Sequence, residues 1–360
     1  MAGHPKISVI MPSFNRGHTI RRAIDSVLAQ DFQDFELIVV DEHSTDGTAE
    51  ILAEYGDRIR VIKEYAKGVA RARNLGIAAA RGEYLCYCDS DDEQLPYRLS
   101  TQAAVLDRLP EVPLVFCDSF IWENGERVTS DSLLRARWIG PTDRSFDEDL
   151  AFHFSHHGTA ATLGLPVPPE LAGRGVHHGS IDGWLCAIHA AWGHSQMHRT
   201  KVVRAVGGHW EALRCYEDWE LSGKISKHHP LAYVDIPLVR YRVHQGEQLT
   251  GTPRPNAESY LENLFHTWRA DRIYYTKYKA TIDRAIGVGY AVLGEVEARA
   301  GNFERSEECF RRAIYEGPIV GKRAFVSLLL SALKSRVPLL RSGLLGDRIP
   351  AYLAHPESRK

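Results

Sequence analysis

The hydrophobic pattern of the first 120 residues switches repeatedly between two periods. Short apolar runs rich in β-branched residues, such as "KISVIM" and "FELIVV", are typical of buried strands. The stretches between them carry apolar residues three or four positions apart, which is typical of a helix with one buried face. The pattern predicts strands at residues 6–11, 35–40, 58–64, 83–88 and 112–120. It predicts helices at residues 18–30, 49–55, 69–80 and 97–109.

Strands and helices that alternate in this way indicate an α/β fold. Successive βαβ units with right-handed crossovers build a mostly parallel sheet, and such sheets bind ligands beyond the carboxyl ends of their strands. Three polar segments follow the first, second and fourth strands: "PSFNR" (12–16), "DEHSTDGT" (41–48) and "DSDDE" (89–93). We therefore expect these segments to meet at one edge of the sheet. No GxGxxG follows the first strand and no GxxxxGK[ST] occurs, so the usual phosphate loops are absent.

The pattern changes twice beyond residue 120. Residues 121–195 are rich in His, Gly and Pro and predict loops with short elements, while order resumes at 199–225 and strands follow at 230–244. From about residue 256 the pattern is helical. We therefore expect one domain at residues 1–250 and a helical region at 256–350.

One helical segment resembles a single tetratricopeptide repeat. The matching positions are Tyr290, Leu293, Gly294, Gly301, Phe303, Phe310, Ala313 and Pro318. Glu297 and Ser306 depart from the repeat, which usually has an aromatic residue and an alanine there. The alternative is a plain helical hairpin that turns at Gly301 and Asn302. In either case one repeat cannot bury its own apolar face and must pack on something else.

The tail at residues 322–341 predicts an amphipathic helix with basic flanks. Such a helix can lie on an anionic membrane, cover the helical hairpin, or pair with a second copy of the chain as a homo-oligomer. We favour packing over membrane contact because the apolar run is short and Pro338 interrupts it.

Composition limits the class of protein. At 360 residues, 44% hydrophobic and 25% charged, the chain is typical of a globular protein, and its net charge of −2 gives no argument for a nucleic-acid partner. The six cysteines form no CxxC pair, which is typical of a reduced protein. We expect no secretory leader and no membrane span. These observations predict a cytoplasmic protein, peripheral to the inner face of the membrane if the tail binds lipid.

The acidic segment after the fourth strand requires an explanation. Asp89, Asp91 and Asp92 stand close together at the mouth of an apolar run, where like charges repel one another. Carboxylate oxygens are hard ligands that suit Mg²⁺ or Mn²⁺. A divalent metal site and a solvated acidic turn are equally good interpretations of this segment taken alone.

Five segments, taken in series, resemble family 2 glycosyltransferases of the GT-A fold. They are "ISVIMPSFNR", "FELIVVDEHSTDGT", "GVARARNLG", "GEYLCYCDSDD" and "EDWEL", and the resemblance covers roughly residues 6–245. It implies a Rossmann-like, mostly parallel sheet flanked by helices, followed here by an all-α region. It further implies a nucleotide-binding half at 1–120, an acceptor-side half at 121–250, and inverting transfer of a sugar from a nucleotide-sugar donor. We expect a UDP-sugar and a role in surface glycan or glycoconjugate synthesis.

The resemblance answers the question of the acidic segment. In this family that segment holds a divalent metal, Mn²⁺ or Mg²⁺, on the donor diphosphate. Asp91 is therefore implied as a metal ligand, and Asp89 and Ser90 as contacts to the metal, its water or the ribose. His244, in "YRVH", is implied as a further ligand, with a structural histidine as the equal alternative.

The resemblance also implies a nucleotide site on the first two loops and the third helix. Asp41 would face the nucleobase, and Glu42 departs from the aspartate that is usual beside it. Arg73 would help to hold the nucleotide, or would be an exposed cation of its helix. The shelf under base and ribose would consist of Pro12, Ser13, Phe14 and Arg16.

The segment "YEDWEL" supplies the implied catalytic base. Asp218 would take the proton of the acceptor as the acceptor attacks the anomeric carbon, in a single displacement. General base catalysis contributes about 10²- to 10⁴-fold. The alternative is that Glu217 and Asp218 are favourable acids at a helix N-terminus, and both interpretations can hold together.

Two other functions compete with transfer of a sugar. A nucleotidyltransferase would share the sheet and the metal, but "PSFNRGH" does not resemble its Gly- and Arg/Lys-rich loop. A silent nucleotide-binding scaffold would not need Asp91 and Asp218. The acceptor could be a glycan, a lipid-linked sugar or a peptide, because residues 121–215 carry no motif that distinguishes these three.

Overall fold

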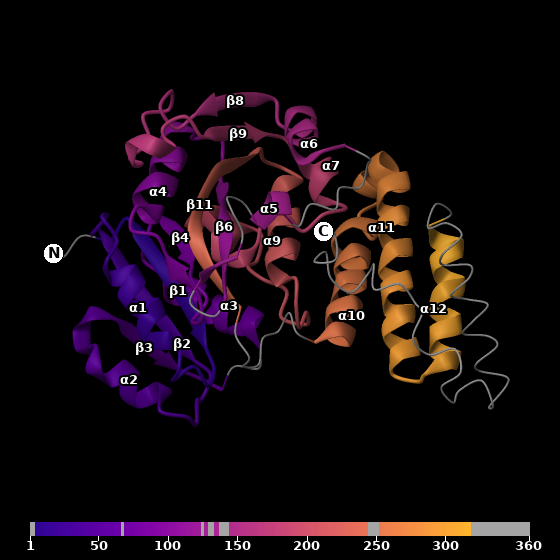
Figure 1. The fold of residues 1–360 in the computed structure, drawn as a ribbon, viewed down its shortest axis with the longest axis horizontal. Helices are drawn as coiled ribbons and strands as arrows, with labels where there is room; N and C mark the ends of the chain where they lie inside the picture. Colours follow the sequence, from indigo (N-terminus) through magenta and orange to yellow (C-terminus); the bar gives the residue numbers. More distant parts are fainter. Residues whose placement is uncertain are drawn as a thin grey trace. The chain divides into compact units, whose positions relative to one another are not determined.

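The computed structural model describes residues 4–65, 68–123, 126–128, 133–136, 144–243 and 252–317. The chain divides into two compact units, Met1–Gly246 and Glu247–Lys360, and each is described by itself (Figure 1). His244, Pro318 and the tail at 322–341 lie outside the described residues.

The first unit is built on a mixed sheet that is mostly parallel on its N-terminal side. In the described part of the unit, this sheet has 11 strands. They are β1 (Ile7–Ser13), β2 (Phe35–Asp41), β3 (Arg60–Lys63), β4 (Tyr84–Tyr87), β5 (Glu93–Gln94), β6 (Leu114–Glu123), β7 (Glu126–Arg127), β8 (His156–Thr159), β9 (Gly175–Gly179), β10 (Gln196–Arg199) and β11 (Leu231–Val243).

The order of the strands brings distant parts of the chain side by side. The main path runs β3-β2-β1-β4-β10-β6-β11-β9-β8. Strands β3, β2, β1 and β4 are parallel to one another, β10 is antiparallel to both of its neighbours, and β6 and β11 are parallel. The parallel sheet predicted from the alternating pattern is therefore confirmed, with an antiparallel insertion that the pattern did not indicate.

Helices flank this sheet (Figure 1). Those of the first unit are α1 (Ile20–Leu28), α2 (Thr48–Glu54), α3 (Val69–Ala79), α4 (Arg98–Arg108), α5 (Leu133–Ala136), α6 (Phe146–His153), α7 (Asp182–Leu185), α8 (Thr200–Ala205) and α9 (Glu217–Ser226). The strands and helices predicted for the first 120 residues are all present within a few residues of their expected ends.

Helix α3 packs flush against the central strand β1. All seven residues of β1 are buried, as expected for a strand covered on both faces. A Cβ atom at Gly76 would lie only 2.4 Å from Ile10 Cγ2, so a glycine is what allows this approach. The close packing fixes the height of α3 above the sheet, and with it the position of Arg73 one turn earlier.

The second unit is helical. It contains α10 (Pro253–Asn263), a π-helical turn at Leu264–Arg269, α11 (Arg272–Arg299) and α12 (Phe303–Glu316). Helices α11 and α12 pack along each other and are joined by a turn in which Gly301 has a φ of +81° (Figure 1). Among the described residues, no helix has the length and apolar character that crossing a bilayer requires.

Glu297 is an unusual core residue of this helical pair. Its side chain is fully buried, and its carboxylate contacts Arg254 at 2.6 Å, Arg305 at 3.2 Å and the side-chain amide of Asn302 at 2.8 Å. The residue that departs from the repeat pattern is thus a buried carboxylate that accepts from more exposed partners, and an aromatic side chain in its place would remove its ion pair with Arg254.

Candidate active site

The loops after β1 and β2 meet at one edge of the sheet, as predicted. Ser13 and Asp41 are register partners at the ends of these strands. The Asn15 backbone N–H donates to Ser44 Oγ at 2.8 Å, and the Thr45 N–H donates to Asn15 Oδ1 at 2.8 Å. These bonds join the two loops into one surface.

Backbone strain is concentrated around this edge. Within the described part of the chain, three residues other than glycine have a left-handed φ: Asn15 at 52°, His43 at 60° and Tyr216 at 64°. Asn15 and His43 lie in the two joined loops, and Tyr216 directly precedes Glu217 and Asp218. Such conformations are uncommon and persist where the surrounding structure enforces them, as functional sites often do.

The predicted nucleotide residues line these loops. Pro12, Ser13 and Asp41 are buried, whereas Phe14 is 50% exposed. Asp41 accepts a hydrogen bond from Ser44 Oγ at 2.6 Å. Glu42 is half-buried, its Oε2 accepts from the Gly68 N–H at 3.0 Å, and burial raises the pKa of Glu42. The structure brings these residues together, and their contacts with a nucleotide stay predictions.

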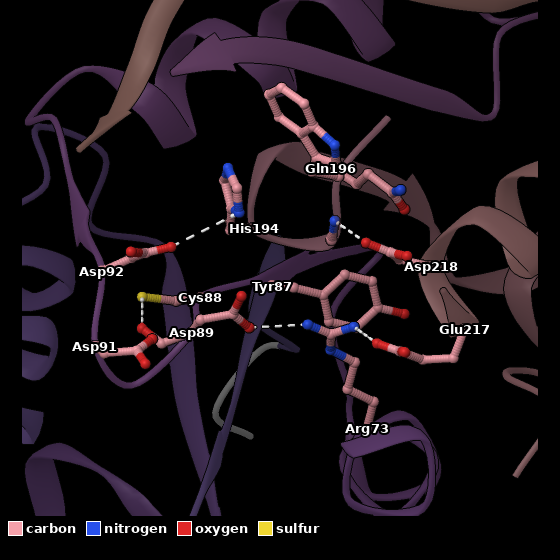
Figure 2. A network of polar contacts seen from close by, with 12 residues as sticks. Arg73, Tyr87, Cys88, Asp89, Asp91, Asp92, His194, Gln196, Glu217 and Asp218 are labelled. Atoms are coloured by element: carbon pink, nitrogen blue, oxygen red, sulfur yellow. Dashed lines mark hydrogen bonds and ion pairs between the residues drawn. The ribbon is translucent and has the colours of Figure 1, made fainter. Parts of the chain in front are cut away.

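Arg73 links the two motifs that carry the proposed chemistry. As a whole residue, Arg73 is 3% exposed. Nη2 lies 2.8 Å from Asp89 Oδ1, and Nη1 contacts Glu217 (Figure 2). The interpretation of Arg73 as an exposed helical cation is therefore wrong. A planar guanidinium can hold two carboxylates in a fixed geometry, which a lysine cannot do.

A buried tyrosine, Tyr87, contacts this arginine, and a buried histidine, His209, contacts the tyrosine in turn. The Arg73 guanidinium lies over the Tyr87 ring, 5.3 Å from its centroid. Burial lowers the pKa of His209 to about 3, so its imidazole is neutral. His209 Nδ1 lies 3.0 Å from the Glu217 carbonyl oxygen, so Nδ1 carries the single proton of the ring. His209 Nε2 accepts a hydrogen bond from the Tyr87 hydroxyl at 3.1 Å. Sequence reasoning did not identify His209, since no local motif marks it.

The acidic loop after β4 is not a solvated turn. Asp92 is 1% exposed and Ser90 is 5% exposed. Asp92 Oδ1 accepts from the Arg242 backbone N–H at 2.9 Å, while Oδ2 is buried without a hydrogen-bond partner. Burial, helped by the charges of Asp91 and Asp89, raises the pKa of Asp92 well above its ordinary value. A cation beside this carboxylate would remove the cost of its burial.

Asp89, Asp92 and His194 form a group that fits a metal ion. One possible ligand atom from each lies within 4.8 Å of the others. His194 Nδ1 is 3.7 Å from Asp92 Oδ2, and burial lowers the pKa of His194 to about 4, so that its imidazole is neutral and able to coordinate (Figure 2). The donor set of two carboxylates and one imidazole, together with the unpartnered Asp92 oxygen, fits a divalent cation.

The metal ligands predicted from sequence overlap only partly with this group. Asp89 belongs to both sets, whereas Asp91 lies outside the group, and its Oδ2 is 3.5 Å from Arg16 Nε. Coordination by Asp91 stays a prediction, and His244 is outside the described residues. His194 was missed because it stands in the irregular stretch at 121–195, and only the folded chain brings it beside Asp92.

Asp218 lies in the first turn of α9 and is held from several directions. Its Oδ2 accepts from the Gly193 N–H at 2.5 Å, and its Oδ1 accepts from the Trp219 N–H at 2.7 Å. His189 Nε2 lies 3.0 Å from Oδ1. Burial alone would raise the pKa of Asp218, but His189, Arg73 and the Gly193 N–H outweigh burial and hold the pKa well below its usual range. The carboxylate is therefore ionised and fixed in orientation.

The chain is similar in part to known glycosyltransferases. Residues 8–162 match the family described as Glycosyl transferase family 2. One relative is the Escherichia coli protein named UDP-Glc:alpha-D-GlcNAc-diphosphoundecaprenol beta-1,3-glucosyltransferase WfgD. It is 34% identical over a region that covers 40% of this chain and 54% of the relative's length. A Campylobacter jejuni relative, GalNAc(5)-diNAcBac-PP-undecaprenol beta-1,3-glucosyltransferase, is 41% identical over 27% of this chain and 33% of its own. The chain thus spans between a third and about half of these curated relatives.

Solved structures of S. aureus TarS share the fold. One crystal structure superposes with a TM-score of 0.56 at 18% identity, covering 93% of this chain and 52% of that chain. TarS 1–349 in complex with UDP-GlcNAc gives a TM-score of 0.53 at 17% identity, covering 92% of this chain and 91% of that chain. The predicted fold class, a GT-A-type sheet followed by helices, is confirmed. Residues 8–162, which match the model of glycosyl transferase family 2, include Arg73 and the acidic loop.

Proposed function

We propose that the protein is an inverting glycosyltransferase that moves a sugar from a UDP-sugar to an acceptor in one displacement. The observation that carries this proposal is the position of Arg73 between Asp89 of the acidic loop and Glu217 beside Asp218. A single buried side chain thereby fixes the distance between a cation site and a carboxylate base. That distance is what a reaction between a bound diphosphate donor and an attacking hydroxyl requires.

The donor side of the site rests on the acidic loop. Asp89, Asp92 and His194 would hold a Mn²⁺ or Mg²⁺ ion, with Asp91 as a further ligand on the strength of the sequence motif. When bound, the ion neutralises charge that develops on the leaving diphosphate. The loops that contain Asp41 and the exposed Phe14 would receive the nucleobase and ribose.

The acceptor side rests on Asp218. Its carboxylate takes the proton of the acceptor hydroxyl while the acceptor oxygen attacks the anomeric carbon from the face opposite the diphosphate. Inversion follows from that single displacement. The N–H groups of Gly193 and Trp219 keep the carboxylate in one orientation. The side chain therefore does not have to change its rotamer before it accepts the proton.

Donor and acceptor are proposed from the relatives. WfgD is named for a UDP-glucose donor and a diphosphoundecaprenol acceptor, and TarS has been crystallised with UDP-GlcNAc. The C. jejuni relative is also named for an undecaprenol-linked acceptor. We propose a sugar on a lipid diphosphate as the acceptor, in preference to a peptide. Peripheral membrane contact is proposed on the same basis. A repeat-like partner surface on the helical unit is proposed from the sequence pattern alone.

A donor screen tests this proposal. UDP released from UDP-glucose and UDP-GlcNAc is measured after removal of metal with EDTA and again after addition of Mn²⁺, with a synthetic GlcNAc-diphosphate lipid as acceptor. We expect Mn²⁺-dependent release that the acceptor stimulates. GDP- and dTDP-sugars are assayed in the same way for their own nucleoside diphosphates. Absence of release from every UDP-, GDP- and dTDP-sugar, with nucleotide binding intact, would favour a silent nucleotide-binding scaffold instead.

A further inference from the structure

One side of helix α11 is exposed over its N-terminal part. Five exposed residues recur there at spacings of four, three, four and four, which places them on one side of a helix: Ile273, Lys277, Ala280, Arg284 and Val288. Ile273 is 78% exposed and Val288 is 41% exposed. The backbone departs from helical angles at Tyr278, and exposed positions continue on both sides of it. We call these five residues the α11 stripe.

The opposite side of α11 forms the core of the second unit. Ile282, Ile286 and Leu293 are buried there. Gly289 lies against α10, since a Cβ atom at this glycine would be only 2.7 Å from Leu261 Cδ2. Helices α10 and α12 both pack on α11 (Figure 1). The face that holds the described unit together is therefore separate from the α11 stripe.

The stripe carries positive charge and no carboxylate. Both of its charged members, Lys277 and Arg284, are cations. Residues 271–284 contain four basic and two acidic side chains. Of the two acids, Asp271 accepts hydrogen bonds from the backbone of the first turn, and Asp283 pairs with a lysine of the preceding turn. The stripe thus combines apolar side chains with cations, which is a combination that suits an anionic and partly apolar partner.

Tyrosine rings border the stripe near its N-terminal end. Tyr274 and Tyr278 are half-buried, and their centroids lie 6.4 Å apart. Lys277 Nζ lies 5.9 Å from the Tyr274 centroid and 4.7 Å from the Tyr278 centroid. Tyrosine is enriched at the headgroup level of membranes, because its ring is apolar and its tip is polar. A helix face with tyrosines, cations and an exposed isoleucine has the composition of one that lies in the membrane interface.

We propose that the α11 stripe contacts the surface of an anionic lipid bilayer. The inference deepens the proposed function, and it rests on the lipid-linked acceptor for the purpose of the contact. Ile273 and Val288 reach the boundary of the acyl chains, while Lys277 and Arg284 contact lipid phosphates. Each basic side chain near such a surface contributes roughly fivefold in affinity.

Charge disfavours two other occupants of the stripe. The tail at residues 322–341 has five basic and no acidic residues, so it would bring like charges to Lys277 and Arg284. A second copy of α11, paired through the same face, would also set cations against cations. An anionic bilayer complements these charges and supplies an apolar layer for Ile273 as well.

Co-sedimentation of the full chain with vesicles tests the proposal. Vesicles of phosphatidylcholine alone are compared with vesicles of phosphatidylcholine and phosphatidylglycerol, at about 0.15 M salt. The variants are Ile273→Ser and the double variant Lys277→Glu/Arg284→Glu. All three positions are exposed, and the circular dichroism signal at 222 nm verifies that each variant is folded.

Two controls match these variants in charge and in exposure. Lys201→Glu/Arg311→Glu changes the net charge by the same amount at exposed positions of α8 and α12. Tyr315→Ser removes another large exposed side chain, 86% exposed on α12. These controls separate the location of the stripe from net charge and from exposed apolar surface in general.

We expect the wild type to pellet with vesicles that contain phosphatidylglycerol and not with phosphatidylcholine alone. Lys277→Glu/Arg284→Glu should lower the lipid affinity at least roughly tenfold, and Ile273→Ser should lower it too, while both controls match the wild type. A wild type that does not bind the anionic vesicles would overturn the proposal. So would α11 variants that bind like the wild type, or a charge control that loses as much affinity as they do.

Release of UDP separates this inference from the proposed function. With water as acceptor, the Lys277→Glu/Arg284→Glu protein should release UDP from UDP-glucose at the wild-type rate, since neither residue belongs to the candidate active site. With a lipid-linked acceptor in anionic vesicles, its release should fall along with its lipid affinity. Unchanged release on that acceptor would overturn the role of the stripe in reaching it. A wild type that binds the vesicles through α11 but releases no UDP would overturn the proposed function and leave the membrane surface standing.

Discussion

Asp92 places a carboxylate in a buried position beside two others, Asp89 and Asp91. Its raised pKa reflects the cost of burying that charge, and its Oδ2 has no hydrogen-bond partner. The sequence motif indicated that this loop holds a cation, but it could not distinguish the buried Asp92 from the more exposed Asp91. The depth of each side chain depends on β11 and His194, which lie more than a hundred residues away in the chain.

Asp92→Asn should therefore separate stability from metal binding. The isosteric amide removes a buried charge, so we expect the urea midpoint of the metal-free protein to stay equal or rise. The enhancement of UDP binding by Mn²⁺ should fall at least roughly tenfold, because one ligand is lost. Calorimetry with and without Mn²⁺ measures this enhancement. An Asp92→Asn protein with the full Mn²⁺ effect would place the cation elsewhere, with Asp91 as the next candidate.

Arg73 is expected to matter for both stability and reaction. Arg73→Ala leaves Glu217 buried without its cation, which costs roughly 3–5 kcal/mol in the free energy of unfolding. Arg71→Ala is the control on the same helix, because the ion pair of Arg71 with Glu211 is exposed at both ends and contributes little. Urea denaturation followed by circular dichroism measures both variants. Equal midpoints for the two would show that the contacts between Arg73 and its acids do not stabilise the fold.

At the scale of elements, the local hydrophobic pattern was sufficient to predict the strands and helices in the first half of the first unit. The strands β1 to β4 and their helices follow the alternation of apolar periods, because each element buries a face encoded within its own residues. The insertion of β10 between β4 and β6 was not predictable in the same way. The four residues of β10 carry no distinctive period, and their place is set by partners about 80 and 110 residues earlier. His189 and His194 were missed for the same reason.

Helix α3 offers a direct test of how packing positions the site. In Gly76→Ala the new methyl group would lie 2.4 Å from Ile10 Cγ2, so α3 or β1 has to shift. Overpacking of this kind costs roughly 1–3 kcal/mol. Gly173→Ala is the matched control, since no atom lies within 4 Å of a Cβ there. Thermal unfolding compares the two, and a Gly76→Ala protein as stable as the wild type would show that α3 is not held flush on β1.

The buried Glu297 tests the helical unit independently. Glu297→Gln keeps the shape of the side chain but weakens its contacts with Arg254 and Arg305, so we expect a loss of about 1–3 kcal/mol. Glu308→Gln removes an exposed ion pair with Arg312 and should change stability by no more than about 0.5 kcal/mol. The helical signal at 222 nm during urea denaturation reports on both. A smaller effect for Glu297→Gln than for Glu308→Gln would contradict the proposed role of the buried Glu297 carboxylate.

On the scale of the whole molecule, the first unit brings two chemical groups to one edge of its sheet. The candidate cation group comes from the loop after β4 and from His194, while the proposed base, Asp218, comes from α9. The family match ends at residue 162, before the segment that contains Asp218. The base is therefore assigned from its geometry and from the resemblance of "EDWEL", and it is the part of the proposal that most needs a direct test.

That test is the turnover of Asp218→Asn for UDP release, measured beside its affinity for UDP in the presence of Mn²⁺. If Asp218 is the base, the amide variant binds UDP with an affinity within about twofold of the wild type but turns over about 10²-fold or more slowly. Near-normal turnover in Asp218→Asn would contradict the account and place the base elsewhere in the site.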